Sequence, residues 1–175
     1  MPIDATRAWL EKAVIGLNLC PFAKAVHFKG QIRWVLCDAH DAAGLLQVLA
    51  QELEFLAAAD PELVDTTLIV HPQVLQDFDD FNDFLGVAED ALADLGLDGV
   101  LQIASFHPQY RFADAAPDDI GNATNRSPHP TLHLLREDSI QRAVMAFPAA
   151  EAIYERNIET LQRLGAAGWK RLLGG

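Results

Sequence analysis

Residues 99–130, GVLQIASFHPQYRFADAAPDDIGNATNRSPHP, decide how this chain folds. An apolar run over 99–106 is typical of a strand, and it ends at His107-Pro108. A long polar segment follows, which gathers aromatic, arginine, acidic and asparagine side chains. Long ordered loops without secondary structure are uncommon in compact domains and are often functional. The stretch therefore predicts a strand whose end opens into a loop that carries a site.

The rest of the chain alternates between short apolar runs and longer amphipathic segments. Strands that alternate with long helices are typical of βαβ units, in which the strands run parallel. We therefore expect a single α/β domain over residues 1–175, with a mostly parallel four-stranded sheet, flanking helices and a long loop at about 107–130. The four expected strands are 32–37, 66–70, 99–106 and 131–135.

Capping residues indicate where the helices begin. Asp41 and Asp77 each precede a segment in which leucine or phenylalanine recurs at helical spacing. Gly96 suits the C-terminal cap of the second of these helices. The other expected helices run from a cap at Asp4 to about Leu17, from a cap at Asp138 to Phe147, and from Pro148 to about Leu164.

Length and composition favour a cytoplasmic protein with no membrane partner. The chain has 175 residues, half of them apolar, which is enough for one domain with a sizeable core. No window approaches the roughly 18 uninterrupted apolar residues of a membrane-spanning helix. The charged N-terminus does not resemble a signal peptide. Two cysteines are too few for a disulfide framework and fit a reducing compartment.

The net charge of −12 is distributed unevenly along the chain. Residues 38–98 hold fifteen acidic side chains and no lysine or arginine, whereas residues 1–37 carry a net charge of +3. The acidic third would repel a duplex, so we expect no nucleic-acid partner. We interpret the acidic residues as solvated helix faces, with a docking surface for a basic partner as the alternative.

Histidines end two of the expected strands, and each is followed by proline: His71-Pro72 and His107-Pro108. Ligands of open α/β sheets bind at the carboxyl ends of the strands, and parallel strands bring these ends to one edge. Imidazole can act there as an acid or a base near neutral pH. We therefore expect His71 and His107 to be catalytic, with a structural hydrogen-bonding role as the alternative.

The loop contains groups suited to an anionic ligand. Arg126 offers a planar fork of donors that matches carboxylate or phosphate. Its alternative role is a salt bridge to Asp118 or Asp119, with the neighbouring polar residues making turns. The expected ligand-binding residues are Tyr110, Arg111, Asn125, Arg126, Ser127 and His133.

Two other kinds of chemistry stay open at this point. His71, His107 and Asp118 are candidate ligands for a divalent metal, although no spacing such as HExxH supports a metal site. Cys20, in Cys20-Pro21-Phe22, resembles the redox cysteines of the thioredoxin superfamily. It follows a helix-like segment instead of a strand, so a small buried apolar role is the alternative to a nucleophile.

Several segments together resemble one family. They are Val14–Lys24, Ala104–Tyr110, Ala116–Asp119, Thr124–Pro128 and Glu155–Ile158. On these segments the chain resembles the bacterial domain-of-unknown-function 1415 family over nearly its whole length. The resemblance implies a bacterial single-domain protein and carries over no activity, cofactor or catalytic residue. It adds Arg156 to the candidate residues, with a surface ion pair to Glu151 or Glu159 as the alternative role.

The function expected from the sequence is an enzyme-like domain that binds a small anionic metabolite at the carboxyl edge of the strands. Acid–base chemistry by histidine would make it a hydrolase or a lyase. A metal-dependent hydrolase with histidine ligands is one alternative. A non-catalytic ligand-binding or protein-interaction module is the other.

Overall fold

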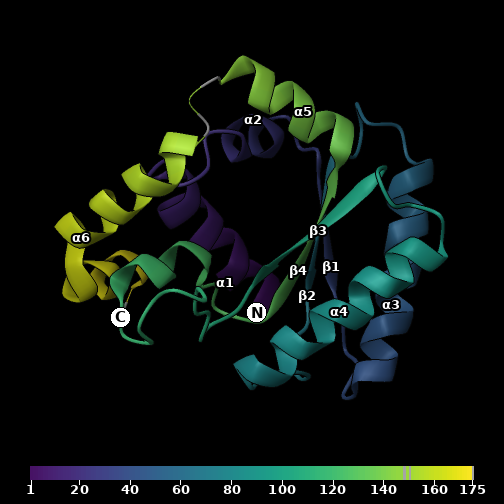
Figure 1. Cartoon of the computed structure of the whole chain (residues 1–175), viewed down its shortest axis with the longest axis horizontal. Helices are drawn as coiled ribbons and strands as arrows, with labels where there is room; N and C mark the ends of the chain where they lie inside the picture. Colours follow the sequence, from purple (N-terminus) through teal and green to yellow (C-terminus); the bar gives the residue numbers. More distant parts are fainter. Residues whose placement is uncertain (148, 150, 175) are drawn as a thin grey trace.

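The computed structural model describes residues 1–147, 149 and 151–174, and it contains one four-stranded sheet with helices on both faces (Figure 1). The strand order is β1-β2-β4-β3. The strands are β1 (Ile32–Leu36), β2 (Thr66–Val70), β3 (Leu101–Phe106) and β4 (Thr131–Arg136). The helices are α1 (Pro2–Trp9), η1 (Leu10–Ile15), α2 (Ala23–Phe28), α3 (Ala42–Ala58), α4 (Phe78–Asp94), η2 (Ile120–Asn125), α5 (Glu137–Ala146) and α6 (Glu151–Leu173).

The sheet is mixed, so the prediction of a mostly parallel sheet is wrong, although the α/β class is confirmed. β1 and β2 are parallel, whereas β4 lies between β2 and β3 and is antiparallel to both. A parallel neighbour needs a crossover of a dozen or more residues, usually a helix that covers one face. The connection from β3 to β4 contains only the short 3₁₀ helix η2, so the chain returns antiparallel.

The strands β1, β2 and β3 nevertheless point in the same direction, because β4 reverses the sense twice across the sheet. Their carboxyl ends therefore share one edge, as expected. Residues 125–130 lie along this edge and enter β4. The backbone N–H of His107 donates to Asn125 O at 3.1 Å, and that of His71 donates to Pro130 O at 3.0 Å.

Helices α3 and α4 cover one face of the sheet (Figure 1). The predicted caps are confirmed, since the Asp41 carboxylate accepts from Gly44 N at 2.7 Å and that of Asp77 accepts from Asp79 N at 2.8 Å. Gly96 follows α4 with a φ of 71°, a left-handed conformation that glycine adopts without strain. The main core lies between these helices and the sheet, and includes Leu45, Leu49, Leu53, Leu56, Phe81, Phe84, Ala88 and Leu92.

The first helix differs from the prediction. It begins at Pro2, so Asp4 lies in its first turn and not at its cap. The helix then widens into the π-helical segment η1 and does not continue to Leu17 as an α-helix. Its buried face contains Trp9 and Ala13. Single π turns often occur at functional sites.

The C-terminal helices also differ from the prediction. Arg136, and not Asp138, is the N-cap residue of α5. Helix α6 passes beyond Leu164 through a kink at Gly165, where φ is 69°, and continues to Leu173. The predicted start of the last helix at Pro148 lies outside the described residues. The continuation beyond the kink places Trp169 against the N-terminal helices.

The stability of this face depends on the side chains of α4. Leu92 has an exposed fraction of 2%, so Leu92→Ala should lower the free energy of unfolding by about 2–5 kcal/mol, because it removes buried methyl groups and leaves a cavity. Urea unfolding measures this change. Val87→Ala on the same helix is the control, since Val87 is 46% exposed and should change stability by less than about 1 kcal/mol. Equal losses in the two variants would contradict the assigned core.

Candidate functional site

His71 and His107 lie at the same edge of the sheet, as the sequence predicts, but both side chains are fully buried. Phe81 packs against both imidazoles, with its ring centroid 5.7 Å from that of His71 and 4.9 Å from that of His107. Three cavities lie among the described residues near this edge and the adjoining face, and neither imidazole lines any of them. Their acid–base role stays a prediction that this geometry does not favour, because both rings are shielded from solvent.

Both ring nitrogens of His107 are engaged in hydrogen bonds with the backbone. The N–H of Gln109 donates to Nδ1 at 3.0 Å, and Nε2 donates to Leu75 O at 3.0 Å. These two bonds fix the neutral tautomer with the proton on Nε2. Burial lowers the pKa of His107, which is consistent with the neutral form. His107 thus joins the segment after β2 to the segment after β3.

Among the described residues the side chain of His71 makes one hydrogen bond, from Nδ1 to Val74 O at 3.1 Å. Its Nε2 is buried and has no partner among the described residues. Burial lowers the pKa of His71 to about 4, with His107 nearby as a smaller cause. The imidazole is therefore neutral at neutral pH and packs as part of the core.

The candidate metal ligands do not come together. His71 and His107 are buried, whereas Asp118 is exposed on the loop. Throughout the described ranges, no three or more histidine, cysteine, aspartate or glutamate side chains are grouped so that they could hold a metal ion. A metal centre built from His71, His107 and Asp118 therefore stays a prediction from the sequence that this arrangement does not favour.

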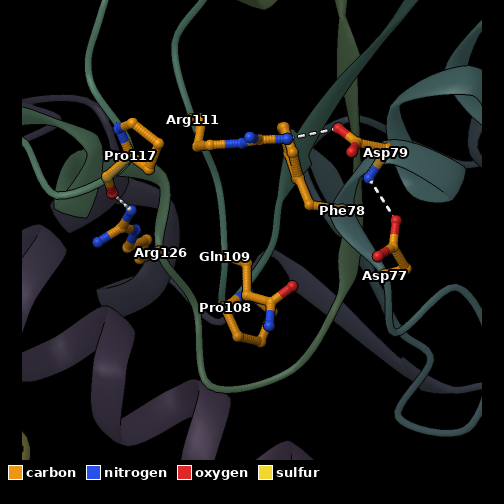
Figure 2. Close-up of a pocket in the computed structure, with 8 residues that line it drawn as sticks. All are labelled: Asp77, Phe78, Asp79, Pro108, Gln109, Arg111, Pro117 and Arg126. Atoms are coloured by element: carbon orange, nitrogen blue, oxygen red, sulfur yellow. Dashed lines mark hydrogen bonds and ion pairs between the residues drawn. The ribbon is translucent and has the colours of Figure 1, made fainter.

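A cavity of about 460 Å³ lies between the loop and the first turn of α4 (Figure 2). The side chain of Arg111 crosses it to pair with the carboxylate of Asp79, and its guanidinium carbon lies 5.4 Å from the centroid of the Phe78 ring. Asp77 is the N-cap residue of α4, and its carboxylate accepts hydrogen bonds from the N–H groups of Asp79 and Asp80. With Asp77 and Asp79 in its wall, this cavity does not favour an anion.

Arg126 lies on the opposite side of the same cavity (Figure 2). Its Nε donates to Tyr110 O at 3.1 Å and its Nη2 donates to Pro117 O at 2.6 Å. Within the described part of the chain, no carboxylate lies at ion-pair distance from it, so a salt bridge to Asp118 or Asp119 is not formed. Burial lowers the pKa of Arg126, but a guanidinium keeps its charge. The loop thus holds a partly desolvated cation by neutral carbonyl groups.

A second cavity, also about 460 Å³, lies between this loop and the helices α1, η1 and α6, and Arg126 and Pro108 line both cavities. Lys12 of η1 adds a second cation, while Trp9 and Trp169 contribute aromatic walls. None of the described residues that line this second cavity is acidic. In a chain with a net charge of −12, this arrangement concentrates positive charge beside the edge of the sheet. We call it the Arg126 cavity.

Several predicted ligand-binding residues are occupied within the protein. Tyr110 packs against Phe78 with ring centroids 5.3 Å apart, and burial raises its pKa. Asn125 donates from Nδ2 to Ser105 O at 3.2 Å. Ser127 lines the Arg126 cavity, but its hydroxyl donates to His129 O at 2.6 Å. These contacts fix the conformation of the loop that carries Arg126.

The remaining predicted residues lie elsewhere. Cys20 and His133 line a third, largely apolar cavity on the face of the sheet opposite α3 and α4. Arg156 is exposed on α6 and lines none of these three cavities. Its neighbour Asn157 is the buried one, and donates from Nδ2 to Leu19 O at 2.8 Å.

Sequence reasoning missed Lys12 and Trp169 in the wall of the Arg126 cavity. Lys12 belongs to a segment that reads as an ordinary amphipathic helix, so no local signal distinguishes it from a solvated lysine. Trp169 follows Gly165, which suggests a helix end in the sequence. A tryptophan beyond a helix end is a signal that another packed element is present.

The fold and the site define an α/β protein with a mixed four-stranded sheet and a cationic cavity beside the edge of that sheet. A family model described as "Protein of unknown function (DUF1415)" matches residues 2–171, so the chain belongs to that family. No curated protein and no solved structure matches the chain. Among the described helices, none is long and apolar enough to cross a membrane.

The buried His71 makes stability depend on pH. Its pKa is 6.5 ordinarily and about 4 in the folded protein, so between these values the unfolded chain binds a proton that the folded chain does not. Lowering the pH through this interval should therefore cost on the order of 3 kcal/mol of stability from this residue. The asparagine of His71→Asn keeps an N–H donor near Val74 O and does not titrate, so this variant should lose less stability over the interval. Urea unfolding at several pH values measures the difference, and parallel curves would contradict the assignment.

Proposed function

We propose that this protein binds a small anionic molecule in the Arg126 cavity, with Arg126 and Lys12 as its cationic groups. The observation that carries the proposal is the guanidinium of Arg126, which has no carboxylate partner among the described residues and shares a cavity with Lys12. Two carbonyl oxygens orient the guanidinium and leave further N–H donors for a ligand, since arginine has five.

The walls of the cavity support a ligand with both charged and flat apolar parts. Trp9 and Trp169 line it together with Pro108 and Pro128. Carboxylate or phosphate groups match the planar fork of Arg126, whereas Lys12 acts as a point charge. Small-molecule sites usually combine mainly apolar walls with a few placed polar groups, and the Arg126 cavity has this composition.

The proposal is a binding function, which favours the ligand-binding module over the hydrolase or lyase. The imidazoles of His71 and His107 are buried and line none of the cavities described above, so a ligand beside Arg126 has no histidine of this pair to exchange a proton with. A basic partner for the acidic helices stays a prediction from the sequence.

Inorganic phosphate, sulfate and succinate serve as test anions. An anion that binds only the folded protein should raise its stability by about 2.7 kcal/mol at a hundred times its dissociation constant. Arg126→Lys should weaken this effect and Lys12→Ala should reduce it. Arg126→Ala should largely remove it. Thermal unfolding at constant ionic strength measures each case.

Arg142→Ala is the matched control, because Arg142 is exposed on α5 and lines none of the three cavities. It should leave the anion effect unchanged. Equal stabilisation of the wild type and all variants would place the anion elsewhere and contradict the proposal. If Arg126→Ala unfolds the protein without ligand, Lys12→Ala and Arg126→Lys decide, since neither removes the cation that the loop carbonyls hold.

A further inference from the structure

The third cavity lies on the face of the sheet opposite α3 and α4, and has a volume of about 300 Å³. Apolar side chains of the sheet form its floor, among them Leu68 and Phe106, and Ile140 and Ala143 of α5 close it from outside. Trp9 lines both this cavity and the Arg126 cavity, and with an exposed fraction of 1% it fills the space between them. The two cavities are therefore separate sites.

His133 and Thr66 are polar residues of the strands that line this cavity. The Nε2 of His133 lies 2.7 Å from the hydroxyl oxygen of Thr66, and that hydroxyl donates its only hydrogen to Leu134 O at 2.6 Å. Nε2 must therefore carry the proton and donate to Thr66. This tautomer leaves Nδ1 as a hydrogen-bond acceptor.

Nothing in the described part of the chain donates to this Nδ1. This Nδ1 is not fully enclosed by other atoms. The unpaired polar atoms of that part that are fully enclosed are Trp9 Nε1, Thr67 Oγ1, His71 Nε2 and Arg136 Nε. The ring lies in the floor of the cavity, and its surface is only partly covered by neighbouring atoms. Burial lowers the pKa of His133 to about 4, so the ring is neutral at neutral pH. A ring that lines the cavity and is incompletely covered faces the space inside it.

The cover of this cavity is thin. Neither α2 nor α5 contains a buried residue. Phe22, just before α2, contacts Phe147, just after α5, with ring centroids 5.4 Å apart. At the rim, Ser139 donates to the carboxylate of Asp65 at 2.6 Å, which leaves that carboxylate hydrogen-bonded. A cover without buried anchors opens at a lower free-energy cost than the core helices, so a small molecule can enter.

We propose that this cavity binds a neutral, mainly apolar molecule with one hydrogen-bond donor, such as an aromatic alcohol, whose hydroxyl donates to Nδ1 of His133. The volume is twice the roughly 150 Å³ in which an apolar protein cavity holds benzene, so a two-ring molecule fits. The apolar walls disfavour a charged ligand, because they cannot replace its hydration. The single accepting nitrogen selects for a hydroxyl over a plain hydrocarbon.

The probe pair 2-naphthol and naphthalene tests this proposal, because the two differ by one hydroxyl. In the wild type, 2-naphthol should bind about two- to tenfold more tightly than naphthalene, the range of one net hydrogen bond. Titration followed by tryptophan fluorescence gives both dissociation constants. Cys20 reports the location, since it lines the cavity, so bound 2-naphthol should slow its alkylation in a Cys37→Ser background.

Two variants separate binding from folding. His133→Leu should abolish the preference for 2-naphthol and leave naphthalene bound. Ala143→Phe places a ring into the cavity from α5 and should abolish binding of both probes while His133 stays intact. Gln141→Phe is its control, because Gln141 is exposed on the same helix and does not line the cavity.

Three results would each overturn the proposal. They are equal affinity of the wild type for the two probes, no binding of either probe, and unchanged binding by Ala143→Phe. If His133→Leu does not fold, the comparison of the two probes in the wild type and in Ala143→Phe decides alone.

Discussion

The hydrogen bonds of the His107 side chain are the constraint on which the edge of the sheet depends. One imidazole accepts from the N–H that follows β3 and donates to Leu75 O in the segment that follows β2. Leu75 has a φ of 58°, a left-handed conformation that costs a leucine about 1–2 kcal/mol, and the bond from His107 helps to hold it there. A protonated ring could not accept from Gln109, so this link requires a neutral histidine. The long loop and the start of α4 are thereby fixed relative to each other.

The two faces of the sheet carry different roles, and the charge pattern of the chain follows this division. Residues 38–98 hold the acidic third and form α3, β2 and α4, whose apolar side chains make the main core. Residues 1–37 are basic and contribute α1, η1 and α2 to the opposite side, where the Arg126 cavity and the third cavity, lined by His133, lie. This separation of charge agrees with the anion site proposed at Arg126, because an acidic surface repels anions and a basic one attracts them.

The elements that the sequence predicted are those with local causes. The β2 strand matches residues 66–70, and the caps at Asp41 and Asp77 are confirmed, because a cap and a spacing depend only on near neighbours in the chain. The direction of β4 depends on whether the connection after β3 forms a crossover helix that packs on the sheet. A short stretch of sequence does not show this. Arg126 and Lys12 line the same cavity although they lie far apart in the sequence, so only the loop arginine could be predicted.

The composition of the loop was the strongest signal in the sequence, and most of it serves the loop itself. Asn122 shows why, since its buried side chain accepts from Phe112 N at 3.0 Å and donates to Ala116 O at 2.8 Å. The backbone N–H and C=O groups of an irregular segment have no regular helix or sheet partners. They therefore form hydrogen bonds with side-chain amides and hydroxyls. A polar side chain in such a loop therefore indicates a binding site only when its donors exceed what the backbone takes up. By this criterion Arg126 differs from Asn122, Asn125 and Ser127, because it is a charged group held by carbonyl oxygens with donors to spare.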